Sequence, residues 1–125
     1  MPRIDRDPNA SGPVVQGFAA GGFVVDGGVY PGLFLTPRRA DLWSPPALAD
    51  LAITHLEPLF ALDPQPEFVL LGTGASMTFA PRALAKALEE RGVGLEVMDS
   101  KAAARTWGML RGEERWIAAA LMPFA

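Results

Sequence analysis

The sequence contains no cysteine and a single histidine, His55. Without cysteine the chain can form no disulfide, thiolate nucleophile, iron–sulfur cluster or zinc–thiolate site. One histidine also argues against a histidine-rich metal site. We therefore expect neither a bound metal nor a cofactor, and the lack of cysteine fits a reducing compartment.

An excess of basic charge is also missing, because 11 Lys and Arg residues face 14 Asp and Glu residues and the net charge is −3. This balance offers no basic surface for nucleic acid. The longest apolar stretch, residues 116–125, is about half as long as a membrane-spanning helix. Residues 1–8 mix charges and prolines where a signal peptide would carry an apolar core. We therefore expect no nucleic-acid partner, no membrane span and a cytoplasmic location.

The length of 125 residues is typical of one domain. Half of the residues are hydrophobic (50%) and 20% are charged, as in globular proteins. Residues 1–13 are polar and rich in Pro, Asn, Ser and Gly, which predicts a flexible N-terminal arm. The remainder, 14–125, is predicted to be a single domain. Nothing in the sequence indicates its oligomeric state.

Strand patterns dominate the first half of this domain. Short apolar runs at 14–18, 23–25 and 33–35 are separated by glycine-containing turns, which predicts a β-meander. Pro31 interrupts the pattern and predicts a bulge or an edge position, because proline cannot donate to a β-ladder. Ser44 and Thr54 are two possible helix starts. Pro58 would make a helix that begins at Thr54 short or kinked, and residues 63–66 are predicted to be a linker.

Strands and helices alternate in the second half. Residues 68–71 are a continuous apolar run, typical of a central strand covered on both faces. A Gly-Thr-Gly turn at 72–74 leads to a helix predicted over 81–91 between a proline and a glycine. A strand over 93–98, a second helix and a buried strand over 116–122 follow. This order predicts an α/β domain.

Two loops of this unit are predicted to meet at one end of the sheet. If strands 68–71 and 93–98 are parallel neighbours, a right-handed crossover brings loops 72–76 and 99–101 together. Ligands of open α/β sheets usually bind at such carboxyl strand ends. We therefore predict a polar cleft formed by Gly72, Thr73, Gly74, Ser76, Asp99, Ser100 and Arg105.

No catalytic or cofactor motif is complete in these loops. A dinucleotide fingerprint needs a third small residue and a helix that begins at once, but Met77 occupies that position and the helix is predicted to begin later. Ser76 lacks the second glycine of a nucleophile elbow, and a triad with His55 and Asp99 has no support in the sequence. A tight turn at 72–74 and a helix cap at Asp99 are the favoured interpretations. We predict no catalytic residue.

Four strings of the second half together resemble a known family: residues 71–74 (LGTG), 91–99 (RGVGLEVMD), 102–107 (AAARTW) and 118–123 (AAALMP). Over roughly residues 14–124 the chain resembles a domain-of-unknown-function family that includes mitochondrial complex I assembly factor 3 and an adipogenesis-associated cytosolic protein. The resemblance implies a three-layer single α/β domain. It would have a mixed central sheet with flanking helices and an extra N-terminal β layer.

The resemblance implies no established catalytic residue and no known cofactor. For the mitochondrial relative it implies action by protein contact during assembly of a membrane complex. The favoured hypothesis is a non-enzymatic interaction or assembly module whose partners, by resemblance, are respiratory complex subunits. Phe34, Trp43 and Pro45 are its candidate contact residues. The alternative is a small-molecule-binding protein or enzyme that uses the polar cleft.

Overall fold

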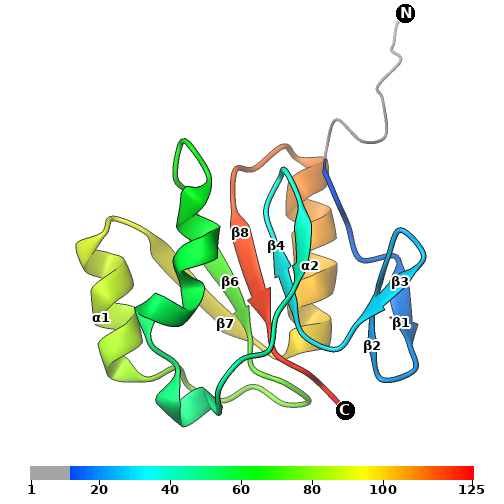
Figure 1. Cartoon of the computed structure of the whole chain (residues 1–125). Coiled ribbons are helices and arrows are strands. Elements are labelled where there is room, and N and C mark those ends of the chain that lie inside the picture. Colours follow the sequence, from blue (N-terminus) through cyan, green and yellow to red (C-terminus); the bar gives the residue numbers. More distant parts are fainter. Residues whose placement is uncertain (1–11) are drawn as a thin grey trace, which may run out of the picture.

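A five-stranded mixed sheet forms the centre of the computed structural model, which describes residues 12–125 (Figure 1). Its strand order is β5-β4-β8-β6-β7. Strand β6 runs parallel to both β7 and β8, whereas β4 runs antiparallel to β8 and β5. The strands are β4 (Leu33–Leu35), β5 (Ala40–Leu42), β6 (Phe68–Gly72), β7 (Gly94–Met98) and β8 (Ala118–Leu121).

Helices cover both faces of this sheet. Helix α1 (Arg82–Glu90) and the 3-10 helix η3 (Ile53–Ala61) pack on one face, and α2 (Ser100–Gly112) packs on the other. A short 3-10 helix, η2 (Leu48–Asp50), precedes η3. Strands β7 and β8 flank β6 on opposite sides, so right-handed crossovers place α1 and α2 on opposite faces. Within residues 12–125, no helix has the length and apolar character needed to cross a membrane.

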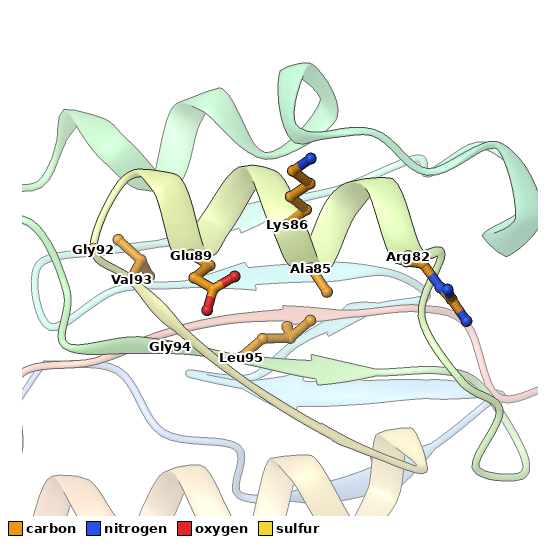
Figure 2. Close-up of a pocket in the computed structure, with 8 residues that line it drawn as sticks. All are labelled: Arg82, Ala85, Lys86, Glu89, Gly92, Val93, Gly94 and Leu95. Carbon is orange, nitrogen blue, oxygen red and sulfur yellow. The ribbon is translucent and has the colours of Figure 1, made fainter.

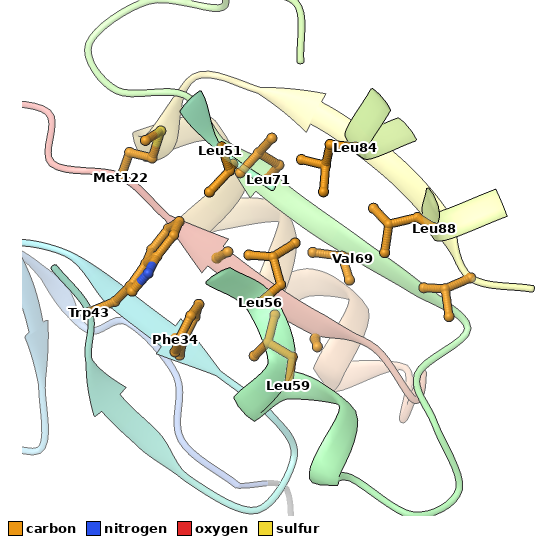
Figure 3. Close-up of a cluster of buried hydrophobic side chains, with 13 residues drawn as sticks. Phe34, Trp43, Leu51, Leu56, Leu59, Val69, Leu71, Leu84, Leu88 and Met122 are labelled. Atoms are coloured by element: carbon orange, nitrogen blue, oxygen red, sulfur yellow. The ribbon is translucent and has the colours of Figure 1, made fainter. Parts of the chain in front are cut away.

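Alternation along the strands builds one core on each face. Ala118 and Ala120 of β8 face α1, whereas Ala119 and Leu121 face α2. All residues of β4 and β8 are buried, because the sheet is covered on both sides. Figure 3 shows the core on the α1 side, with leucines from η3, β6 and α1 packed together.

Three short strands form a separate antiparallel sheet beside α2. These are β1 (Gly17–Ala19), β2 (Gly22–Val25) and β3 (Gly28–Tyr30). Phe23 and Val25 pack into the core on the α2 side. Trp107 of α2 donates its indole N–H to the carbonyl of Pro13 at 2.9 Å. The predicted three-layer α/β fold with an N-terminal β layer is thus confirmed.

The first half differs from the predicted meander in one respect. It divides into two sheets, because the chain leaves the small sheet after Tyr30 and enters the central sheet at Leu33. Pro31 and Gly32 lie at this crossing. A Cβ at Gly32 would clash with the backbone carbonyl of Trp43, so glycine permits a close approach there. Of the predicted arm over 1–13, residues 1–11 lie outside the described part of the chain.

Candidate functional site

The carboxyl ends of β6 and β7 lie side by side. Their parallel register pairs Phe68 with Gly94 and ends with Gly72 beside Met98. From here β6 leads to α1 on one face and β7 leads to α2 on the other, which is the topological switch point of an open α/β sheet. The structure brings together five of the predicted cleft residues: Gly72, Thr73, Gly74, Asp99 and Ser100.

Ser100 fills the space between these strand ends. Its hydroxyl donates to the carbonyl of Met122 at 2.7 Å and accepts the N–H of Gly74 at 2.8 Å. Its backbone N–H donates to the carbonyl of Gly74 at 2.9 Å, and the residue is 0% exposed. A Cβ on Gly72 would lie 2.7 Å from Ser100 Oγ and 2.8 Å from its Cα. Because Gly72 has no side chain, the first turn of α2 packs directly against β6.

Thr73 and Asp99 also bond to neighbouring backbone. The hydroxyl of Thr73 donates to the carbonyl of Ser76 at 2.7 Å and accepts the N–H of Thr78 at 3.0 Å. The carboxylate of Asp99 accepts the N–H of Ala102 at 2.9 Å and caps α2. The interpretation of Asp99 as a helix cap is confirmed.

Ser76 and Arg105 lie apart from this cluster. Ser76 is exposed, and its hydroxyl has no hydrogen-bond partner among residues 12–125. Arg105 is on α2 beside residues 15–18, where it lines a depression of about 160 Å³. His55 accepts the N–H of Ala52 at 2.9 Å at the start of η3. His55 is therefore an exposed residue of the first turn of η3, next to the N-cap residue Ala52.

The paired charges lie on other parts of the surface. Arg115 donates to Glu67 at 3.0 Å, and this hydrogen bond holds the pKa of Glu67 below its ordinary value. Arg39 makes two hydrogen bonds to Asp41, at 2.7 and 2.8 Å, and the pKa of Arg39 is raised. In the part of the chain that the structure describes, no three His, Asp or Glu side chains are placed to hold a metal ion.

The loop between β6 and α1 exposes apolar side chains at this same end of the molecule. Phe79 is 84% exposed and Met77 is 49% exposed. The hydrogen bonds of Thr73 to Ser76 and Thr78 hold the loop just before Phe79. In the sequence, Met77 entered only as the residue that breaks the dinucleotide motif, and Phe79 was not among the predicted site residues. One pattern in the sequence could have indicated this exposed surface. Two large apolar residues, Met77 and Phe79, lie in the segment between a predicted strand and a predicted helix and follow the apolar pattern of neither.

The aromatic contact residues predicted in the first half are wrong. Phe34 and Trp43 are only 6% and 7% exposed. Their rings stack with centroids 4.6 Å apart in the core on the α1 side (Figure 3). Pro45 is half-buried. Phe34 and Trp43 therefore stabilise the core and offer little surface to a partner.

The fold and these strand ends define a small three-layer α/β domain with a mixed central sheet. The chain belongs to the family described as protein of unknown function (DUF498/DUF598), whose model matches residues 15–122. This confirms the family resemblance seen in the sequence.

Two relatives and one solved structure illustrate the similarity. The chain is 30% identical, over 91% of its length, to NADH dehydrogenase [ubiquinone] 1 alpha subcomplex assembly factor 3 of Danio rerio, and it spans 66% of that relative. It is 33% identical to an uncharacterised protein of Rhodobacter capsulatus, over 94% of this chain and 91% of that one. A crystal structure of a Bordetella parapertussis protein matches with a TM-score of 0.79 and 29% identity, covering 89% of this chain and 95% of that chain.

Proposed function

We propose that this protein acts by binding other proteins, as a non-enzymatic module in the assembly of respiratory complex I. The observation that carries the proposal is the exposure of Phe79, at 84%, on a loop with internal hydrogen bonds. Aromatic side chains are enriched at the centres of protein interfaces. A loop that is already held in shape loses less conformational entropy on binding. Phe79 and Met77 are therefore the proposed contact residues.

The chemistry at the strand ends favours this function over catalysis. Ser100 is fully buried, and its hydroxyl already donates one hydrogen bond and accepts another. The carboxylate of Asp99 is engaged at the start of α2. A ligand would have to replace these bonds before it reached the hydroxyl of Ser100. The alternative of a small-molecule site therefore has less support here than a surface for protein contact.

The relatives support the same kind of action. The Danio rerio relative is named as an assembly factor of NADH dehydrogenase, and most of this chain is similar to it. We infer that the shared domain makes the contact with the complex that is being assembled. A subunit of the NADH dehydrogenase complex is the proposed partner, and the cytoplasm is the proposed place of the contact.

A complementation experiment in the source organism tests the proposal. Cells that lack the gene should accumulate less complete complex I on native gels, and the wild-type gene should restore it. The Phe79→Ser variant should fold normally but fail to restore the complex, because its interface anchor is lost. Met109→Ser is the matched control, since Met109 is 60% exposed on α2, away from this loop.

Two results would overturn the proposal. One is a normal amount of complete complex I in cells that lack the gene. The other is full restoration by a stable Phe79→Ser protein, which would remove the loop from the contact. A loss of restoration with both Phe79→Ser and Met109→Ser would also count against this loop as the specific surface.

A further inference from the structure

Strand β7 is the last strand of the central sheet, and its outer edge pairs with no strand among residues 12–125. On its inner side, the N–H of Gly94 donates to the β6 side at 3.0 Å, and the carbonyl of Met98 accepts a bond from that side, also at 3.0 Å. In a parallel ladder, alternate residues bond to the same neighbour. The N–H and C=O groups of Leu95 and Val97 therefore point away from β6, toward solvent.

A groove of about 770 Å³ runs between this strand and the outer flank of α1 (Figure 2). Ala85 lies in the middle of the helix side, and Leu95 lies across from it on β7. Gly94 on the strand has no side chain. The small residues leave room for another strand to approach the free edge of β7.

Opposite charges lie toward the two ends of this groove. Arg82 is at the start of α1 and Glu89 is near its end (Figure 2). The helical rise separates them by about 10 Å. Neither makes an ion pair with another described residue. A two-fold axis between them would place Arg82 of each copy near Glu89 of the other, so the groove complements itself.

We propose that a second copy of this chain pairs with β7 in the antiparallel direction and joins the two central sheets into one. Leu95 would lie opposite Leu95 of the second copy. Val93 would then face Val97 on the α1 side, and Gly94 would face Glu96 on the other side. This register joins apolar residues to apolar residues. It also places Glu96 opposite Gly94, which has no side chain, so that the two Glu96 carboxylates do not face each other.

The hydrogen bonds of this register use the groups that point to solvent. Leu95 of each copy would donate to the carbonyl of Leu95 in the other, and Val97 would donate to the carbonyl of Val93. The N–H of Val93 is already bonded to the carbonyl of Leu88 at 3.0 Å, so it needs no partner across the interface. The outward N–H groups of Leu95 and Val97 therefore both find acceptors in the other copy, whereas the carbonyl of Val97 has no donor opposite it.

The opposite edge of the sheet is less suited to pairing. Strand β5 has only three residues, and its Asp41 makes an ion pair, at 2.7 Å, with Arg39 just before the strand. Short, charged strands are a common protection against edge-to-edge association. Strand β7 has five residues and a single charged one, Glu96. The proposal does not depend on the proposed function, because it rests on this edge and not on the loop that carries Phe79.

Sedimentation velocity of the full chain, from micromolar to millimolar concentration at low salt, tests the proposal. The wild-type protein should form a dimer in a concentration-dependent way. Arg82→Glu should raise the dimer dissociation constant roughly tenfold, because it turns two attractions into repulsions. The double variant Arg82→Glu/Glu89→Arg should restore dimerisation. Both changes suit the dipole of α1, so a loss of dimer cannot come from a weakened helix.

A second variant and a second measurement address the strand itself. Leu95→Pro removes an outward N–H that β6 does not use, so it should abolish the dimer while the fold survives. In the wild type, exchange of the Leu95 and Val97 amide protons should slow as protein concentration rises. If the chain stays monomeric at millimolar concentration, the proposal is overturned. The edge of β7 would then be available only to a strand of a different protein. A dimer that persists unchanged in Arg82→Glu, with fast exchange at both amides, also overturns it.

Discussion

Ser100 and Gly74 are hydrogen-bonded to each other in both directions. The N–H of Ser100 donates to the Gly74 carbonyl at 2.9 Å, and the N–H of Gly74 donates to the Ser100 hydroxyl at 2.8 Å. The same hydroxyl donates to the carbonyl of Met122 at 2.7 Å. These bonds join the loop after β6, the first turn of α2 and the chain that follows β8. A ligand cleft was predicted at the carboxyl ends of β6 and β7. In the structure, hydrogen bonds at this place connect three segments of the chain instead.

Removing the Ser100 hydroxyl should destabilise the protein. Ser100→Ala leaves the buried N–H of Gly74 and the carbonyl of Met122 without their partner, at a cost of about 2–4 kcal/mol. Urea unfolding measures the change. Ser76→Ala is the control and should stay within about 0.5 kcal/mol of the wild type, because Ser76 is exposed and its hydroxyl bonds to no described residue. Equal stability of Ser100→Ala and Ser76→Ala would contradict the structural role of Ser100.

The close approach of α2 to β6 predicts opposite effects for two glycine substitutions. Gly72→Ala places a Cβ 2.8 Å from the Ser100 Cα, so it should destabilise by about 1–3 kcal/mol. Gly108→Ala lies within α2, and no atom beyond its own helical turn and chain neighbours lies within 4 Å of the new Cβ, so it should stabilise by about 0.5–1 kcal/mol. Thermal unfolding of both variants checks the prediction. If Gly72→Ala is neutral, the contact between α2 and β6 is looser than described.

Two substitutions at Asp99 separate a helix cap from a charged functional group. Asp99→Ala removes the acceptor for the N–H of Ala102 and should cost about 1 kcal/mol. Asp99→Asn keeps an acceptor oxygen without the charge and should retain most of the stability. Chemical unfolding and complex I assembly in cells are the two measurements. Normal stability of Asp99→Asn together with a loss of assembly would indicate a need for the charge itself.

The Arg115–Glu67 pair predicts a pH dependence of stability. The hydrogen bond from Arg115 lowers the pKa of Glu67, so the folded protein binds this proton less tightly than the unfolded chain. The contribution is therefore full above the ordinary pKa of a glutamate, and it is lost as pH falls through the lowered value. Arg115→Gln should raise the pKa of Glu67 in an NMR titration. Arg39→Gln, whose partner is Asp41, should leave it unchanged. Equal Glu67 titration in both variants would contradict the pairing.

The order of elements in the second half could be predicted because its local signals agree. The apolar run before Gly72 is strand β6, and the predicted helix over 81–91 is α1 at Arg82–Glu90. Asp99 is the cap that begins α2. In each case an apolar pattern and a boundary residue point to the same structure. The parallel pairing of β6 and β7 follows from the short crossover through α1.

Contacts between distant segments could not be predicted in the same way. Ser100 appears in the sequence as a polar residue after a strand, and only the packing of α2 against Gly72 buries it. Trp43 appears as an exposed aromatic among prolines, but it stacks on Phe34 inside the core. Conversely, no segment within residues 12–125 covers Phe79, which is 84% exposed. Burial at these positions depends on which elements meet in space, and a local pattern does not contain that information.

The most direct test of the account places a photo-crosslinking amino acid at position 79 in cells and identifies the trapped proteins by mass spectrometry. Position 109, at the exposed Met109 of α2, serves as the matched control. The account predicts crosslinks from position 79 to a subunit of the NADH dehydrogenase complex, and few or none from position 109. Failure to trap such a subunit at position 79, or equal trapping at both positions, would contradict it.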